Sequence, residues 1–204
     1  MKLYASSYGL GNEPAKLQAL FAPAAAVAIV TNALDFSSDL PRRASALQRE
    51  IGDLATIGLV AAELDLRNYF GRKQALDEQL ARYAGVWVVG GNTFILRRAM
   101  RYSGFDELLP LRARDFVYAG YSAGSCVLAP TLRGIDLIDP PDEVPDGYAS
   151  GILWDGLGLL DYSIAPHFRS KHPDFARVEL VVDYFVQHGM PYRALRDGEV
   201  IVVE

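Results

Sequence analysis

Residues 116–124, with the sequence FVYAGYSAG, decide the fold and the candidate chemistry of this 204-residue chain. The segment begins with the short apolar run FVYA, which is typical of a strand buried on both faces. It ends in a G-x-S-x-G pattern centred on Ser122, where small residues permit a sharp turn into the helix that follows. A strand, a tight turn and a helix in this order indicate one unit of a parallel α/β sheet.

The same unit recurs along the chain, with no internal repeat or linker between copies. We therefore expect one domain over residues 1–204, an α/β fold with a mainly parallel sheet and helices on both faces. A last strand at 199–203 is expected to be antiparallel at an edge, and a proline- and glycine-rich long loop is expected at 131–148. Apolar runs predict strands near 2–7, 25–31, 58–66, 86–89 and 162–165, and helical spacing predicts helices near 14–21, 42–57, 72–83, 93–102 and 173–187.

Composition excludes several classes of protein. Half of the residues are hydrophobic, 22% are charged and the formal net charge is −5, so a basic face for nucleic acid is not indicated. The first residues lack the apolar core of a secretory signal, and the longest apolar run is too short to span a membrane. A single cysteine fits a reducing compartment, so we expect a cytoplasmic protein with no nucleic-acid or membrane partner. No metal or cofactor is indicated, and the sequence carries no signal for an oligomeric state.

The G-x-S-x-G turn is expected to lift the Ser122 hydroxyl above the sheet as a nucleophile. The next backbone amide, that of Ala123, then points to a developing oxyanion. A second donor is expected from the GGN turn at 90–92, where the Gly91 amide follows the preceding strand. Two other interpretations stay open: a glycine-rich turn that only packs a helix or holds a phosphate, and a helix-entry turn with Asn92 as N-cap.

A serine nucleophile needs a base, and the chain has three histidines. His167 follows an apolar run that ends at the same edge of the sheet, so it is the preferred base. His188 lies at a helix end and His172 lies in a polar segment, which favours surface roles for both. Cys126 falls one helical turn beyond the serine and is not expected to be a nucleophile. Spacing alone does not choose the third member of a triad among Asp136, Asp139, Asp142, Glu143, Asp155 and Asp161.

The order of these motifs resembles the peptidase E family, which is the aspartyl dipeptidase or serine peptidase S51 family. The similar segments are GGNTF at 90–94, GYSAGS at 120–125, APT at 129–131, PHF at 166–168 and TNALD at 31–35. The resemblance implies a class I glutamine-amidotransferase-like (flavodoxin-like) three-layer α/β/α fold. It also implies a role for five residues: Ser122 as nucleophile, His167 as base, Asp136 as the acid, and the amides of Gly91 and Ala123 as the oxyanion hole.

One segment departs from the family. Dipeptidase members carry a G-H-x-G-E-T-R-like stretch after PHF that is linked to recognition of an N-terminal aspartate, and this chain has RSKHPD at 169–174. Arg169, Lys171 and Arg177 keep cations there that can meet a carboxylate. We expect a serine exopeptidase, dipeptidase-like, that acts on short peptides with a preference for an N-terminal Asp and binds substrate through Asn92 and Arg169. The alternatives are an esterase-type serine hydrolase and a non-catalytic module that binds a small anion.

Overall fold

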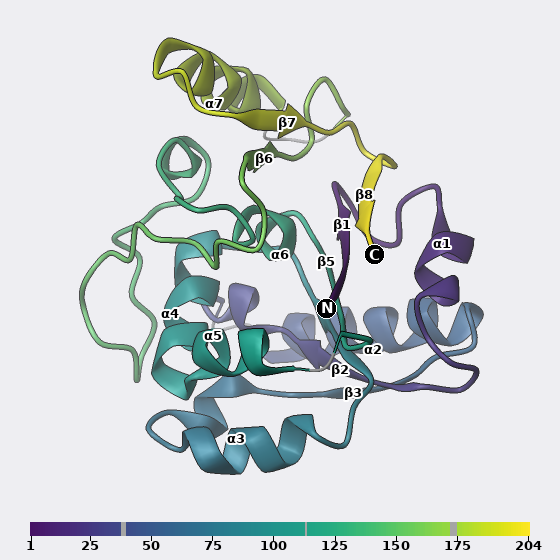
Figure 1. The fold of residues 1–204 in the computed structure, drawn as a ribbon. Helices are drawn as coiled ribbons and strands as arrows, with labels where there is room; N and C mark the ends of the chain where they lie inside the picture. Colours follow the sequence, from purple (N-terminus) through teal and green to yellow (C-terminus); the bar gives the residue numbers. More distant parts are fainter. Residues whose placement is uncertain (38–39, 113, 172–174) are drawn as a thin grey trace.

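The structure is a computed structural model that describes residues 1–37, 40–112, 114–171 and 175–204. Within these residues, six strands form one sheet in the order β3 (Val60–Glu63), β2 (Ala26–Val30), β4 (Gly85–Val88), β5 (Val117–Tyr121), β1 (Lys2–Ser6) and β8 (Val200–Val203) (Figure 1). β8 runs antiparallel to β1 at one edge, and the other neighbours in this sheet are parallel. The predicted mainly parallel sheet with an antiparallel last strand is confirmed.

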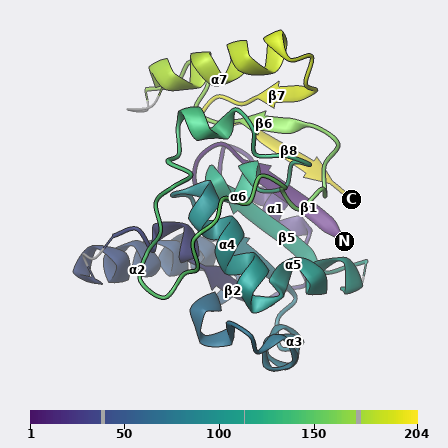
Figure 2. The ribbon, with the colours of Figure 1, turned by 90° about the vertical axis from the view of Figure 1, so that its left-hand side faces the viewer.

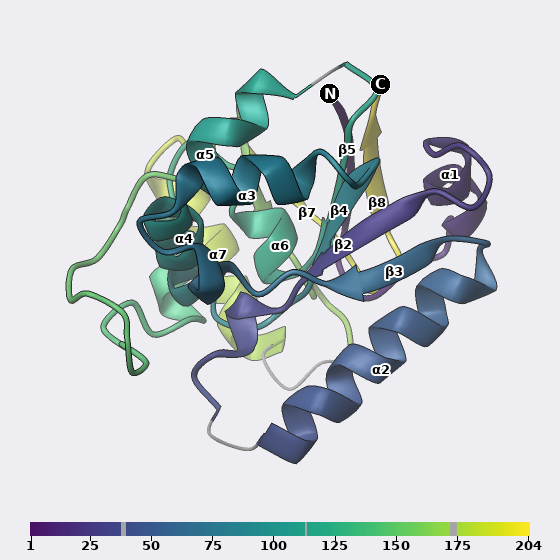
Figure 3. The same ribbon diagram turned by 90° about the horizontal axis from the view of Figure 1, so that it is seen from below.

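Helices cover both faces of the sheet, as Figure 3 shows. One face carries α1 (Pro14–Ala19) and α2 (Leu40–Thr56), and the opposite face carries α3 (Lys73–Leu80), α4 (Thr93–Ser103), α5 (Phe105–Leu108) and α6 (Ala123–Cys126). The predicted three-layer α/β/α architecture is therefore confirmed. No helix in the described part of the chain is long and apolar enough to cross a membrane. Short 3-10 helices occur in the connections at η1 (Asn32–Leu34), η2 (Leu66–Tyr69), η3 (Leu109–Leu111) and η4 (Ile135–Leu137).

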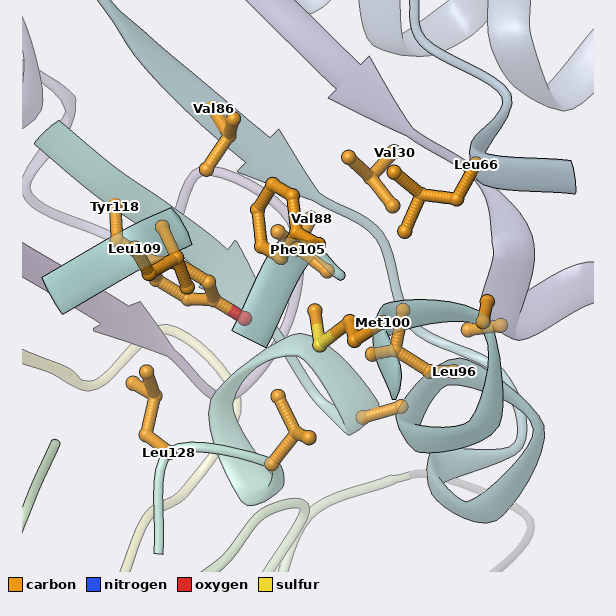
Figure 4. Packing of buried hydrophobic residues seen from close by; sticks show 14 of the residues in the cluster. Val30, Leu66, Val86, Val88, Leu96, Met100, Phe105, Leu109, Tyr118 and Leu128 are labelled. Carbon is orange, nitrogen blue, oxygen red and sulfur yellow. The ribbon is translucent and has the colours of Figure 1, made fainter. Parts of the chain in front are cut away.

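Alternate residues of β4 point to opposite faces of the sheet and supply two separate cores. Val86 and Val88 pack with the α4 and α5 side, where they share a cluster with Phe105 (Figure 4). Trp87 lies in the other cluster, with Leu54 of α2. A strand that is apolar at every position is thus buried on both faces, as parallel strands in α/β proteins usually are.

A second, two-stranded parallel sheet consists of β6 (Ser163–Ala165) and β7 (Tyr192–Ala194), joined through α7 (Phe175–Gln187). It lies apart from the main sheet, next to α6, in both views (Figures 1 and 2). Cys126 of α6 packs in one cluster with Ala165 and with Phe185 of α7. β7 was not predicted, because its sequence Tyr-Arg-Ala, with an exposed arginine in the centre, gives no apolar run.

The loop at 131–148 is present as predicted and is fastened to α4 by a buried arginine. Arg98 has no exposed surface, and its guanidinium donates to the backbone carbonyl oxygens of Pro141, Glu143 (2.9 Å) and Gly151 (2.8 Å). Apart from η4, the loop has no helix of its own. Its position therefore depends on this side chain more than on local backbone structure.

Replacing Arg98 should free the loop while leaving the sheet intact. Arg98→Met removes the donors of three carbonyl groups, and we expect a loss of about 1–3 kcal/mol in the free energy of unfolding. Amide hydrogen exchange in residues 139–151 should accelerate more than exchange in β4 and β5. Arg101→Met, on the same helix but 44% exposed, is the matched control and should change little. Unchanged exchange in the loop of Arg98→Met would contradict this role.

Candidate active site

Ser122 lies on the sharp turn between β5 and α6. Its backbone has φ 49° and ψ −115°, a strained conformation for a residue with a side chain. The turn is possible because α6 approaches β4 closely at Gly124, where an added Cβ would lie 2.3 Å from the carbonyl oxygen of Val88. The G-x-S-x-G pattern therefore has a steric cause, and it presents the Ser122 hydroxyl to the pocket described below.

His167 comes from the second sheet, two residues beyond the end of β6. Its Nε2 lies 3.1 Å from the Oγ of Ser122, within reach for proton transfer. The residue is buried and has φ 61°, and its backbone N–H donates to Ser7 Oγ at 2.8 Å. The two residues that the sequence predicted as nucleophile and base are thus brought together from separate sheets.

The other ring nitrogen of His167 contacts Asp197, which was not among the predicted acids. Nδ1 lies 2.7 Å from Asp197 Oδ1, and the same oxygen accepts a hydrogen bond of 3.0 Å from Ser7 Oγ. The Asp197 N–H donates to Ser170 Oγ at 2.7 Å, so backbone and side chain are both held. The structure therefore gives the imidazole an orienting carboxylate, as a triad requires.

Asp136, the predicted acid, lies elsewhere. It is the second residue of η4, and its Oδ1 accepts the backbone N–H of Gly134 at 2.8 Å. A carboxylate used in its own turn is a common local arrangement for aspartate. The assignment of Asp136 to the triad is therefore corrected, and Asp197 takes its place at the histidine.

A signal for Asp197 was present in the sequence. The antiparallel last strand had been predicted, and an antiparallel strand begins at the edge where its parallel neighbours end. Ser6, at the end of β1, pairs with Val200 at the start of β8, so the residues just before β8 arrive beside Ser7 and His167. Asp197 lies outside the predicted acids because those lie between Ser122 and His167 in the chain, whereas Asp197 reaches the histidine through the sheet edge.

Gly91 and Ala123, the two residues whose amides were predicted to form an oxyanion hole, both line the pocket. Ala123 is the first residue of α6, where helical N–H groups have no partner within the helix. Gly91 has φ 145° and fits against η1 so closely that a Cβ would lie 2.3 Å from the carbonyl oxygen of Ala33. Only glycine fits there without a shift of the backbone.

The pocket around Ser122 has a volume of about 400 Å³. Its described lining includes one carboxylate, that of Asp139, and no lysine or arginine. The ring of Tyr8 covers the histidine side, with its centroid 6.1 Å from the His167 ring and 5.9 Å from the Tyr121 ring. The lining also includes Leu34, Phe36, Gly90, Gly91, Ala123, Cys126, Ile138 and Pro166.

The two predicted substrate-binding residues lie outside this lining. Asn92 caps α4: its side-chain oxygen accepts the N–H groups of Phe94 and Ile95, and its amide nitrogen donates to the carbonyl oxygen of Pro140 and to Glu143. With its oxygen and nitrogen both engaged, Asn92 is a capping residue, which was the alternative interpretation of the GGN turn. Arg169 donates to Glu179 of α7 at 3.2 Å and lies over the Phe168 ring. The structure therefore shows Asn92 as a helix cap and places Arg169 outside the described pocket lining.

Two other candidates for catalysis are described: His188 lies away from the pocket, and Cys126 is unsuited as a nucleophile. His188 hydrogen-bonds through Nδ1 to the carbonyl oxygen of Tyr184 and stacks on that ring, at the end of α7. His172 lies outside the described residues. Cys126 lines the pocket, but burial, and then the negative charge of Asp139, raises the pKa of its thiol well above the ordinary value. A thiol that resists ionisation is a poor nucleophile.

A serine on a strand-to-helix turn, next to an imidazole that contacts a carboxylate, is the arrangement of serine hydrolases. The model of one family, peptidase family S51, matches residues 18–204. The chain belongs to this family.

Individual relatives are more distant. An uncharacterized peptidase of Listeria monocytogenes is 28% identical over 135 residues, which cover 64% of this chain and 62% of the relative. A Drosophila melanogaster protein named a probable alpha-aspartyl dipeptidase is 31% identical over 142 residues, 65% of this chain and 53% of its own length. The chain thus spans between half and two thirds of these curated relatives. A solved L. monocytogenes structure assigned as a peptidase E has a TM-score of 0.74 at 19% identity, over 100% of this chain and 98% of that one.

The site can be tested without knowing a substrate. An alkyl fluorophosphonate should label Ser122 in the wild-type protein and should not label Ser122→Ala. Loss of the base in His167→Ala should slow labelling by about 100-fold or more. His188→Ala is the matched control and should label at the wild-type rate, as measured by mass spectrometry over time. Equal rates for the two histidine variants would show that the contact at Ser122 has no chemical role.

Proposed function

We propose that this protein is a serine exopeptidase, dipeptidase-like, that hydrolyses short peptides through Ser122, His167 and Asp197. The observation that carries the proposal is the chain of contacts from Ser122 Oγ to His167 Nε2, and from His167 Nδ1 to Asp197. Family membership supports peptide bonds as the substrate class. A pocket of about 400 Å³ supports a small substrate, since sites of this size hold small molecules and not extended chains.

The geometry supports the following steps. His167 Nε2 takes the proton of the Ser122 hydroxyl as Oγ attacks the scissile carbonyl carbon, and the N–H groups of Gly91 and Ala123 stabilise the oxyanion. Asp197 stabilises the imidazolium that forms. Nε2–H then protonates the leaving amine, the C–N bond breaks and an acyl-enzyme remains. His167 then removes a proton from water, whose oxygen attacks the acyl carbon. The imidazolium returns the proton to Ser122 Oγ as the bond between Oγ and the acyl carbon breaks, which releases the free acid.

A preference for an acidic first residue was the finer expectation from the sequence, and the pocket offers little support for it. That expectation rested on Arg169, Lys171 and Arg177, none of which is part of the described lining. The charged side chain that does line the pocket is the Asp139 carboxylate, which repels a second carboxylate. We therefore propose a dipeptidase without an acidic preference at the first position.

Asp197 and Asp136 give a direct test of the triad. Asp197→Asn keeps the shape of the side chain but removes the charge that stabilises the imidazolium, so kcat should fall by about 10²- to 10⁴-fold. Asp136→Asn alters only a turn in η4 and should stay within about threefold of wild type. Initial rates on a dipeptide such as Ala-Leu measure both. A larger loss in Asp136→Asn than in Asp197→Asn would return the role to the sequence-predicted acid.

A substrate panel tests the reaction class. Ala-Leu, Leu-Leu and Asp-Leu should be cleaved by wild type, with Asp-Leu no better than Ala-Leu, and all turnover should be lost in Ser122→Ala. The circular dichroism spectrum of Ser122→Ala should remain that of wild type, because the hydroxyl contributes little to packing. p-Nitrophenyl acetate separates the esterase alternative. Turnover of the ester without any turnover of peptides would sink the exopeptidase proposal and leave only the serine chemistry.

A further inference from the structure

A second pocket, of about 390 Å³, adjoins the catalytic pocket on the α2 side. The two pockets share three walls, formed by Leu34, Phe36 and Tyr121. The second pocket is otherwise lined by Ser37, Arg43, Ser45, Ala46 and Arg49. It therefore combines apolar walls with two guanidinium groups, in contrast to the catalytic pocket.

The two arginines of the second pocket differ in what they contact. Arg43 is nearly buried and forms an ion pair with Asp35, and it also donates to Thr31 Oγ1 at 2.9 Å. Arg49 is 59% exposed, and its nearest carboxylate is Glu50, at 3.3 Å. A guanidinium has five donors, so one contact leaves Arg49 able to bind a carboxylate from a ligand.

Asp139 lines the catalytic pocket, whereas Arg49 lines the adjoining second pocket. Its Oδ2 accepts hydrogen bonds from the N–H and the Oγ1 of Thr93, at 2.9 and 2.6 Å, and Thr93 is the first residue of α4. α4 and α2 cover opposite faces of the sheet (Figure 3). Ser122 lies between them at the end of β5, so a ligand in both pockets meets a carboxylate on one side and a guanidinium on the other.

The side of the leaving group is also indicated. His167 must protonate the leaving amine, so the second substrate residue lies on the histidine side of Ser122. The rings of Tyr8 and Tyr121 form a continuous wall from His167 to the second pocket, with centroid distances of 6.1 and 5.9 Å. This wall leads the leaving residue toward Arg49.

We propose that Asp139 binds the terminal ammonium of the substrate and Arg49 binds its terminal carboxylate, so that the site selects dipeptides by their two charged ends. The inference rests on the proposed peptidase function and names its substrate class. A fully extended dipeptide spans about 7 Å, and the two pockets adjoin through Leu34, Phe36 and Tyr121. A longer peptide would place an amide, and not a carboxylate, at Arg49, and the guanidinium would then lose its charged partner. The apolar walls of the second pocket receive the side chain of the second residue.

Arg49 has a structural alternative that the experiment must separate. Glu50 is buried, accepts hydrogen bonds from Trp87 Nε1 (2.8 Å) and the Tyr121 hydroxyl (2.9 Å), and has Arg49 beside it as a counter-charge. If that were its entire role, Arg49→Met would affect all substrates equally through Tyr121 and would lower the Tm.

The test compares Ala-Leu with its C-terminal amide, Ala-Leu-NH2. Arg49→Met should lower kcat/KM for Ala-Leu by about 10- to 100-fold and change the amide by less than about threefold, because only the free acid loses a charge-assisted contact. Arg49→Lys should restore part of the loss. Arg82→Met removes a positive charge from an exposed position two residues beyond α3 and is the matched control, expected to act as wild type on both substrates. Equal losses on acid and amide would overturn the role of Arg49.

Asp139 is tested in the same way at the other end. Asp139→Asn keeps an oxygen for the Thr93 N–H but removes the charge, so it should lower kcat/KM for Ala-Leu by about 10-fold or more and leave N-acetyl-Ala-Leu unaffected. An equal effect on both peptides would overturn the role of Asp139. Asp-Leu-NH2 has a carboxylate on its first side chain but none at its C-terminus. If Arg49→Met lowers kcat/KM for Asp-Leu-NH2 as much as for Ala-Leu, Arg49 binds the first side chain and the proposal is wrong.

Calorimetry separates this inference from the proposed function. In a Ser122→Ala background, Ala-Leu should bind at least about tenfold tighter than Ala-Leu-NH2, and Arg49→Met should remove the difference. Tighter binding of Ala-Leu than of Ala-Leu-NH2, without any turnover by wild type, would refute the peptidase function but support the site that binds the terminal carboxylate. Turnover by wild type with equal Kd values for acid and amide would refute the end-binding site alone.

Discussion

The contact between Ser122 and His167 joins two separate sheets, and the rest of the site depends on holding those sheets in register. Ser7, the first residue after β1, does this with one hydroxyl. Its Oγ accepts a hydrogen bond from the backbone N–H of His167 and donates one to the Asp197 carboxylate. Both residues are therefore anchored to the end of β1 in the main sheet. A base carried on a sheet of two three-residue strands would otherwise have few contacts to fix its distance to the nucleophile.

Backbone strain at Ser122 and His167 follows from the same arrangement. Both have positive φ, a conformation that costs of the order of 1–3 kcal/mol for a residue with a side chain. The strain persists because the surroundings hold both residues in place. The close approach of Gly124 to Val88 fixes α6, which follows Ser122, and the hydrogen bond to Ser7 fixes the backbone of His167. Two side chains held in this way need little reorganisation when a proton moves between them, which is what preorganised catalysis requires.

Residues that follow directly from local patterns could be predicted from the sequence. The apolar runs gave the strands of the main sheet, and the glycine turns located Ser122, Gly91 and Ala123. Asp197 could not be found in the same way because its position depends on β7, which has no apolar pattern, and on the pairing of β8 with β1. Asn92 shows the converse: a polar residue in a glycine turn beside the site is used by the helix that it caps. Local sequence thus locates groups on strand ends, whereas long-range pairing decides which of them meet.

The residues proposed for catalysis lie at or near strand ends, whereas those proposed for substrate binding lie in the connections between strands. Ser122 and Ser7 follow strands directly and Gly91 lies three residues beyond β4, so the hydrogen bonds of the sheet set their positions. Asp139 comes from the loop fastened by Arg98, and Arg49 from α2, neither of which the sheet register fixes. Loops vary more among relatives than the scaffold that carries them. Membership of peptidase family S51 therefore bears more on the proposed reaction at Ser122 than on the proposed substrate, whose ends are assigned to residues of one loop and of α2.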